Sequence, residues 1–411
     1  MNYQVKNIYG KTNNKNITVP VSGSKSITAR AMLISALADG ESTLFNAQFS
    51  DDCATFLKCL NALGISTHTN GTTVKITGCG GKLAVNQAEI NVGSAGTAAR
   101  FLPAFLAFQS GKFKVDSSAQ MKNRPVEPLI TALTQLGARF TFLEKENSFP
   151  FIIEGAAAPN TQITVDISKS SQYLSALLIS AVCANKTVTI KPTGFHGRDY
   201  IDMTLNIMWS FGVNVEENNG VFIVNGRYSS KKYDIEPDVS AACYFYAMNK
   251  ILGTSTAVNG VFPHSMQGDI KFINLLKTFN GGTVDMHAFS DQALTLAAIA
   301  PYLAKPTHIT GVKHIRGQEC DRIKAIICNL TSLGVECEEY DDGVKIYPAP
   351  DGGIKPATIR TFGDHRVAMS FALTGLRADG IIIENAEVCS KTFAEYFQTL
   401  DNVCAELTRK S

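Results

Sequence analysis

The stretch that decides the fold is LNALGI at residues 60–65, which is followed by the apolar segment VKI at residues 74–76. An apolar helix end closed by glycine and continued by two short strands is typical of a helix–hairpin unit. The arrangement recurs along the chain, with stop glycines at Gly64, Gly137 and Gly212 and weaker copies at Gly281 and Gly334. The first three glycines are 73 and 75 residues apart, so the sequence predicts serial duplication of one unit.

Each unit contains a second helix that begins at a short polar loop. The first loop, SGSKSITAR at residues 22–30, brings glycine, three serines, a lysine and an arginine to the start of an apolar helix. A helix N-terminus offers unpaired N–H groups and the positive end of a dipole, so this loop predicts an anion site. Taken alone, it could equally be an ordinary Ser-capped helix with a solvated lysine. Further loops at residues 93–97, 168–172, 238–240, 290–291 and 363–366 make six units.

The six units predict two α/β domains of similar build. A chain of 411 residues exceeds what one hydrophobic core usually serves. Residues 3–20 read as two strands without a preceding helix, and the last helix, near residues 393–407, lacks following strands. The N-terminus is therefore expected to complete the last unit. Residues 22–236 would form a continuous domain, and residues 1–21 with 237–411 a split one.

Two chain crossings, near residues 20–23 and 234–238, would then form a two-strand hinge. Six helix starts, three from each domain, would face the cleft between the domains, where pockets tend to lie.

Composition limits the class of protein. A net charge of +2 with 18% charged residues gives no sign of a nucleic-acid partner. The longest apolar runs, such as residues 173–184, are too short to span a bilayer, and the N-terminus has no signal-peptide core. We therefore expect a cytoplasmic protein without membrane association. The ten cysteines are scattered without metal-binding spacing, which argues against zinc and against a disulfide framework.

The polar loops differ in chemistry between the two predicted domains. Those of the continuous domain carry hydroxyls and cations, whereas those of the split domain carry carboxylates as well, beside His365. Cations next to carboxylates suit a ligand with phosphate or carboxylate groups that also needs proton transfer. For any single residue a surface ion pair is the simpler explanation, so only the combination predicts chemistry.

Nine motifs, in order along the chain, resemble those of the 5-enolpyruvylshikimate-3-phosphate synthase family. They are GSKS at 23–26 with Arg30, AGT at 95–97 with Arg100, MKNRP at 121–125, SSQ at 170–172, YID at 200–202, MQGD at 266–269, ECDR at 319–322, DHRVAM at 364–369 and KTF at 391–393. The resemblance implies two similar domains of three βαβαββ units each, an inside-out α/β barrel that closes on substrate. It also implies a monomeric transferase of the shikimate pathway to chorismate and the aromatic amino acids, without metal or organic cofactor.

The reaction so implied moves the enolpyruvyl group of phosphoenolpyruvate to the 5-hydroxyl of shikimate 3-phosphate and releases phosphate. Carried over by motif, the shikimate-phosphate site comprises Lys25, Ser26, Arg30, Ser170, Ser171, Gln172, Tyr200, Asp291 and Gln318. The phosphoenolpyruvate site comprises Lys25, Ser94, Gly96, Arg124, Gln172, Arg322, Arg366 and Lys391.

In this resemblance Asp291 takes the proton of the attacking hydroxyl, and Glu319 with Lys25 protonates the methylene carbon. From its position alone, at a helix start between Asp364 and Arg366, His365 is a further candidate proton donor. An acid and a base on opposite sides are what addition of a weak nucleophile to an enol requires.

Three positions depart from the family pattern on the shikimate-phosphate side. Gly197 replaces a phosphate-binding serine, Gln318 a lysine and His314 an asparagine. We hypothesise that Lys169, Arg198 or His314 supplies part of the missing charge.

Two other functions stay open at this point. One is enolpyruvyl transfer to UDP-N-acetylglucosamine, against which the loop at residues 120–125 lacks the cysteine that usually serves as acid. The other is a catalytically silent relative that binds phosphate ligands, against which the proton-transfer residues are all retained.

Overall fold

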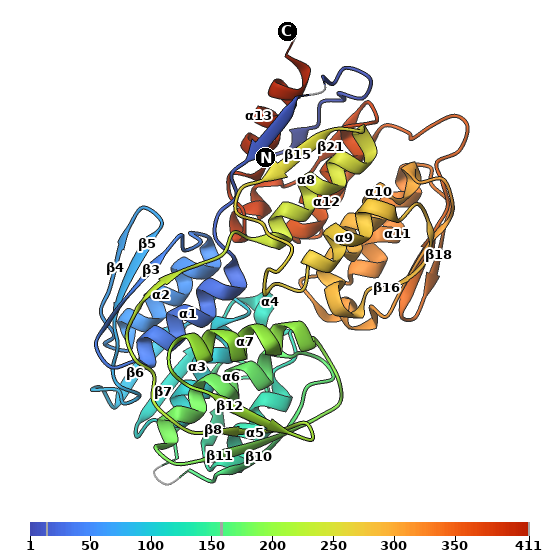
Figure 1. Ribbon diagram of the computed structural model, residues 1–411. Coiled ribbons are helices and arrows are strands. Elements are labelled where there is room, and N and C mark those ends of the chain that lie inside the picture. The colour runs from blue at the N-terminus through green and yellow to red at the C-terminus, as the bar shows by residue number, and fades with distance from the viewer. Residues whose placement is uncertain (14, 157–158, 410–411) are drawn as a thin grey trace. The chain divides into compact units, whose positions relative to one another are not determined.

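The computed structural model describes residues 1–13, 15–156 and 159–409 (Figure 1). The chain divides into two compact units, a continuous unit of residues 23–236 and a split unit of residues 1–22 and 237–411. These bounds differ by one residue from the expected ones. Where the chain passes from one unit to the other, the Ser24 amide donates to the Glu236 carbonyl at 2.8 Å, and the Asp238 amide donates to the Ser22 carbonyl at 2.9 Å.

The continuous unit holds three four-stranded sheets with one common strand order. They are β14(Lys232–Asp234)-β3(Glu41–Phe45)-β5(Thr73–Thr77)-β4(Thr67–Asn70), β6(Gln87–Asn91)-β7(Lys112–Asp116)-β9(Phe151–Glu154)-β8(Arg139–Phe142) and β10(Gln162–Asp166)-β11(Val188–Thr193)-β13(Val221–Val224)-β12(Val215–Asn218). In each sheet the first pair is parallel and the two following pairs are antiparallel. The last strand of this unit, β14, is therefore the edge strand of the sheet that belongs to the first repeat.

The helices of the continuous unit are α1(Lys25–Leu37), α2(Asp51–Ala62), α3(Ala98–Ala107), α4(Ala119–Lys122), α5(Glu127–Leu136), α6(Gln172–Ser180), η1(Ala181–Ala184) and α7(Arg198–Ser210). Gly64, Gly137 and Gly212 follow α2, α5 and α7 with φ of 80°, 108° and 94°, and each precedes a hairpin. The predicted helix–glycine–hairpin unit is confirmed at all three places.

The split unit repeats the plan with less regular sheets. They are β16(Gly282–Asp285)-β17(Thr307–Thr310)-β19(Gly343–Ile346)-β18(Cys337–Tyr340), β1(Tyr3–Gln4)-β21(Ile381–Ile383)-β20(Ala357–Ile359) and β15(Ser255–Val258)-β2(Asn16–Val19). Its helices are α8(Val239–Leu252), α9(Ile270–Thr278), η2(His287–Gln292), α10(Ala293–Ile299), η3(Ala300–Tyr302), η4(Lys313–Gly317), α11(Arg322–Ser332), α12(His365–Gly375), η5(Ala386–Lys391) and α13(Tyr396–Thr408).

The two N-terminal strands serve two different sheets. As predicted, β1 completes the last repeat, since it pairs antiparallel with β21. In contrast, β2 pairs parallel with β15 and opens the fourth repeat. Gly334 stands before the hairpin β18–β19, but Gly281 precedes the single strand β16, so reading Gly281 as a copy of the hairpin unit was wrong.

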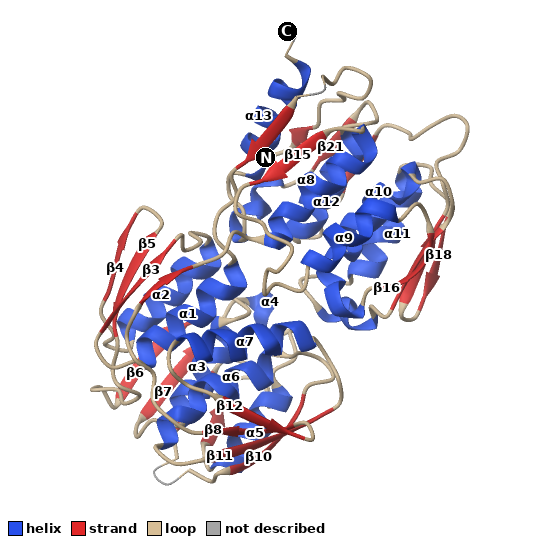
Figure 2. Ribbon diagram, in the orientation of Figure 1, coloured by secondary structure: helices blue, strands red, loops and turns tan. Residues whose placement is uncertain are grey.

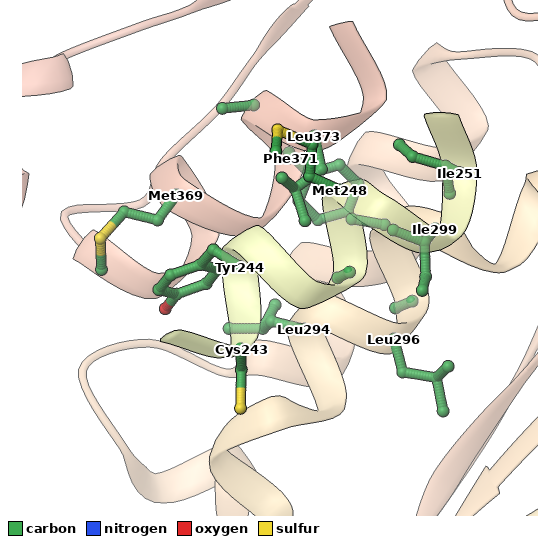
Figure 3. Close-up of a cluster of buried hydrophobic side chains, with 14 of the residues drawn as sticks. Cys243, Tyr244, Met248, Ile251, Leu294, Leu296, Ile299, Met369, Phe371 and Leu373 are labelled. Carbon is green, nitrogen blue, oxygen red and sulfur yellow. The ribbon is translucent and has the colours of Figure 1, made fainter. Parts of the chain in front are cut away.

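Helices fill the interior of each unit, and the sheets lie outside them (Figure 2). Every residue of α1 from Ile27 to Leu37 is buried, as are all residues of α3 and α10. The structure buries α1 on all sides, including its polar side chains Thr28, Arg30 and Ser35. Figure 3 shows the same arrangement in the split unit, where side chains of α8, α10 and α12 interdigitate.

Strands of the sheets alternate between buried and exposed residues, as in β5 and β10. Their buried side faces the central helices and their other side faces solvent. Within the described part of the chain, no helix is both long and apolar enough to cross a membrane. The ten cysteines are all free, and six of them are buried.

Candidate active site

A buried guanidinium organises the polar cluster of the split unit. Arg322 is the first residue of α11, and its side chain is only 2% exposed. Its Nε donates to Asp364 Oδ2 at 2.8 Å, its Nη1 to Asp291 Oδ1 at 3.1 Å and its Nη2 to Glu319 Oε2 at 2.9 Å. Three carboxylates from three loops thus converge on one cation, which fixes the starts of α10, α11 and α12 against one another.

Two further cations extend this cluster. Arg366 Nη2 donates to Asp291 Oδ2 at 2.8 Å, and Lys391 Nζ lies 3.2 Å from Glu319 Oε1. Burial by itself would lower the pKa of Arg322, but the charges of Asp364, Glu319 and Asp291 together raise that pKa above its ordinary value. We call this set the carboxylate–cation cluster: Asp291, Glu319, Arg322, Asp364, Arg366 and Lys391.

Helix α12 begins inside this cluster. Asp364 is its N-cap, is fully buried, and accepts from the Arg366 amide at 2.8 Å. His365 is 1% exposed, and its Nδ1 lies 3.8 Å from Asp364 Oδ1. A carboxylate at a helix N-terminus is stabilised by the helix dipole, which adds to the stabilisation that the buried Asp364 receives from Arg322.

In the continuous unit, the first polar loop places Lys25 at the start of α1. Its Nζ lies 3.4 Å from Asp52 Oδ2, and the Asp52 side chain is only 6% exposed. Asp52 lies in none of the motifs identified in the sequence, so the sequence analysis did not predict it as the partner of Lys25. Its one signal is a position in the first turn of α2, where acidic residues are common.

Arg30 lies deeper, with 2% exposure. It donates to Thr204 Oγ1 at 2.8 Å, to the Ser26 carbonyl at 2.9 Å and to the Tyr200 carbonyl at 3.3 Å. Burial lowers the pKa of Arg30 to about 10. All these acceptors are protein atoms, so Arg30 joins α1 to α7 beneath the loop that carries Lys25.

A third group surrounds the turn before α3. A side chain atom added at Gly96 would lie 3.2 Å from Arg124 Nη1, which places the Arg124 guanidinium directly over this turn. Arg100, 2% exposed, donates to the Gly96 carbonyl at 3.4 Å and to the Pro125 carbonyl at 2.8 Å. Ser94 Oγ is 2.7 Å from Ser118 Oγ. The predicted residues Ser94, Gly96 and Arg124 are therefore neighbours.

The loop before α6 lies beside the start of α7. Ser170 Oγ accepts from the Gln172 amide at 3.2 Å, and Ser171 is the buried N-cap of α6. Gly197 precedes α7 with φ of 59°, and a Cβ there would meet Ser171 Oγ at 2.6 Å. A serine at position 197 would therefore displace Ser171, which explains the glycine.

The structure also bears on the groups expected to supply missing charge. Arg198 donates to Glu217 Oε1 and Oε2 at 2.6 and 2.7 Å and to Asp202 Oδ1 at 2.8 Å. Two carboxylates pair with this guanidinium, so Arg198 could act on a substrate phosphate only by exchanging these partners, and its contribution to the missing charge stays a prediction. His314 Nε2 is 2.8 Å from Ser290 Oγ, next to Asp291, whereas Gln318 ends η4 and Lys169 is exposed.

Within residues 1–13, 15–156 and 159–409, no group of His, Cys, Asp or Glu side chains is arranged to hold a metal ion. The carboxylates of the carboxylate–cation cluster are instead matched by arginine and lysine.

Comparison with known proteins shows one family. The family model described as EPSP synthase (3-phosphoshikimate 1-carboxyvinyltransferase) matches residues 10–282 and 277–400. A 3-phosphoshikimate 1-carboxyvinyltransferase of Nostoc sp. is 40% identical over 405 residues, covering 92% of this chain and 95% of that protein. One from Citrobacter koseri is 36% identical over 412 residues, covering 94% and 96%.

Solved structures show the same fold. An EPSP synthase from Acinetobacter baumannii superposes with a TM-score of 0.79 at 21% identity and covers 98% of both chains. The enolpyruvyl transferase NikO from Streptomyces tendae superposes with a TM-score of 0.70 at 14% identity, covering 97% of this chain and 96% of that one. On the family match and the identity to full-length relatives, the chain belongs to the EPSP synthase family.

Proposed function

We propose that this protein transfers the enolpyruvyl group of phosphoenolpyruvate to the 5-hydroxyl of shikimate 3-phosphate and releases inorganic phosphate. The observation that carries the proposal is the carboxylate–cation cluster, in which Arg322 touches Asp291 and Glu319 at 3.1 and 2.9 Å. Two carboxylates held apart by one guanidinium are a base and an acid with fixed separation, which an addition–elimination reaction needs.

The first step forms the bond between the hydroxyl oxygen and C2 of phosphoenolpyruvate. Asp291 takes the hydroxyl proton, while Glu319 delivers a proton to C3 and converts the methylene into a methyl group. In the second step C3 returns a proton, the double bond reforms, and the bond between C2 and the phosphate oxygen breaks. Glu319, assisted by Lys25, thus gives and takes back the C3 proton, and the hydroxyl proton that Asp291 removed leaves with the phosphate.

The cations bind the two anionic ends of phosphoenolpyruvate. Arg322 and Arg366 already hold carboxylates at 3.1 and 2.8 Å, so a substrate carboxylate or phosphate can exchange with these partners without new desolvation of the guanidinium groups. Arg124 and Lys391 complete the clamp. Developing charge in the transition state would then meet fixed donors.

On the acceptor side we propose that Lys25, Ser26, Ser170, Ser171, Gln172 and Tyr200 hold shikimate 3-phosphate, with Arg30 beneath them and Gln318 at the ring. The buried N-cap Ser171 and the backbone amides at the start of α6 favour the phosphate. We further propose that both units act on the same substrate pair, that the hinge near residues 20–23 and 234–238 permits their closure, and that the enzyme works in the cytoplasm as a monomer.

The test is phosphate release from phosphoenolpyruvate by the purified protein with shikimate 3-phosphate, with UDP-N-acetylglucosamine and without acceptor. Release that requires shikimate 3-phosphate, and that is lost in Glu319→Gln, supports the proposal. Release only with the UDP-sugar would move the chain to the cell-wall reaction. Binding of phosphoenolpyruvate without release under any condition would overturn catalysis altogether.

A further inference from the structure

A buried polar chain lies behind Asp291, outside the residues assigned above. Its centre is Asp269, which precedes α9 and is 4% exposed. Asp269 Oδ2 accepts from Gln292 Nε2 at 2.9 Å and from the Ser240 hydroxyl. Gln292 Oε1 in turn accepts from Thr295 Oγ1 at 3.0 Å, and this hydroxyl is 3.2 Å from Ser370 Oγ. The chain links the starts of α8, α9 and α10 to α12.

This buried polar chain is connected to Asp291, the proposed base, through the backbone of Gln292. Gln292 is the residue after Asp291 and the N-cap of α10, and it is fully buried. The side-chain amide of Gln292 is held at its nitrogen by Asp269 and at its oxygen by Thr295. The neighbouring peptide that carries Asp291 is thereby held in one orientation. Asp291 can therefore present its two oxygens to Arg322 and Arg366 at once, at 3.1 and 2.8 Å.

The burial of Asp269 is unusual for a carboxylate. Among the described residues none forms an ion pair with it, and its two donors are a hydroxyl and an amide. A buried carboxylate without a direct cation costs stability when it is ionised. A neutral polar residue would make the same hydrogen bonds at a lower desolvation cost, so the negative charge of Asp269 must serve something other than these bonds.

The electrostatic interaction of Asp269 with Asp291 and Arg366 explains its charge. Burial, and after it the negative charge of Asp291, raises the pKa of Asp269 to about 6, against the opposing effect of Arg366 and of the bonds from Ser240 and Gln292. The charges of Asp269 and Asp238 also act on Cys243 within α8, where burial first and these charges after it raise the pKa of the thiol. A Coulomb interaction acts on both partners, so the charge of Asp269 also acts on the Asp291 carboxylate.

We propose that Asp269 is a positioning residue for Asp291: through Gln292 it fixes the start of α10 and with it the peptide that carries the Asp291 carboxylate. This inference rests on the proposed function of Asp291 as the base. It adds a support for Asp291 that lies outside the substrate site.

Two substitutions separate the hydrogen bonds of Asp269 from its charge. Asp269→Asn removes the charge and keeps the bonds, because both donors converge on one oxygen, Oδ2, which an amide oxygen can replace. Gln292→Leu removes the bond and keeps the charge. Thr374→Val is the matched control, since Thr374 Oγ1 is a buried donor to the Ala298 carbonyl at 3.0 Å between the same helices α12 and α10.

We expect Asp269→Asn to move the acid limb of the pH profile of kcat to lower pH and to reduce kcat at pH 7.5 by roughly three- to tenfold. Gln292→Leu should reduce kcat without lowering the pH of that limb. Thr374→Val should change neither. If Gln292→Leu keeps kcat within twofold of the control, the proposal is wrong.

A readout without activity distinguishes failure of this inference from failure of the proposed function. The folded-state pKa of about 6 lies above the ordinary value of 3.8, so the folded wild type binds the extra proton and loses stability as pH rises from about 4 to about 6. Asp269→Asn should lack this loss and melt at or above the wild-type temperature at pH 7.5. A variant that melts lower at pH 7.5 and shows the wild-type pH dependence would mark Asp269 as merely structural. Absent transfer by wild type would instead refute the proposed function.

Discussion

Replacing Arg322 by lysine tests whether the cluster depends on the shape of the guanidinium or only on its charge. Lysine keeps one positive charge but reaches in a single direction, so at least two of the three carboxylate contacts at 2.8, 3.1 and 2.9 Å are lost. Hydrogen bonds to charged groups contribute roughly 1.5–3 kcal/mol each, which amounts to about 3–6 kcal/mol for two. We expect kcat/KM for phosphoenolpyruvate to fall by about 10²- to 10⁴-fold.

The matched control is Arg316→Lys. Arg316 also binds two carboxylates, Asp321 at 3.0 Å and Glu339 at 2.8 Å, but these side chains are 26% and 40% exposed. Pairs of this kind contribute about 0–1 kcal/mol. Steady-state kinetics with varied phosphoenolpyruvate, together with thermal unfolding, would compare the two variants. If Arg322→Lys retains kcat/KM within threefold of Arg316→Lys, the argument from bond directions is refuted.

Three further predictions concern the continuous unit. Gly96→Ala should raise KM for phosphoenolpyruvate by roughly tenfold and leave KM for shikimate 3-phosphate unchanged, because the new methyl group would lie 3.2 Å from Arg124 Nη1 and push that guanidinium aside. Asp52→Asn should lower kcat by about tenfold at unchanged melting temperature, since Lys25 loses the carboxylate 3.4 Å away that holds its ammonium group. Arg198→Ala should leave KM for shikimate 3-phosphate within twofold, because Arg198 is already paired with two carboxylates.

Each of these predictions has a result that would contradict it. Gly352→Ala is the control for the first, since no atom lies within 4 Å of a Cβ at that position, and an equal effect of both alanines would refute the steric argument. An Asp52→Asn enzyme with wild-type kcat would show that Lys25 needs no carboxylate partner. A large rise in KM for shikimate 3-phosphate in Arg198→Ala would support the hypothesis that this arginine binds the phosphate.

Local patterns account for much of the fold. The glycines at positions 64, 137 and 212 adopt positive φ at helix ends, and the adjacent apolar pairs form hairpins, because both features depend on residues close in sequence. The polar loops likewise begin helices α1, α6 and α12 as expected. The order of the motifs also pointed to the family before any contact was known.

The sequence by itself therefore determined the repeat, the helix and hairpin elements and the residue types of the site. Only the tertiary structure decided that β2 pairs with β15, more than two hundred residues along the chain, and which side chains meet at Arg322. It also revealed the partners of Asp52, Asp269 and Asp364, which are distant in sequence. The physical reason is that hydrogen bonds and burial depend on neighbours in space, and a short segment carries no record of those neighbours.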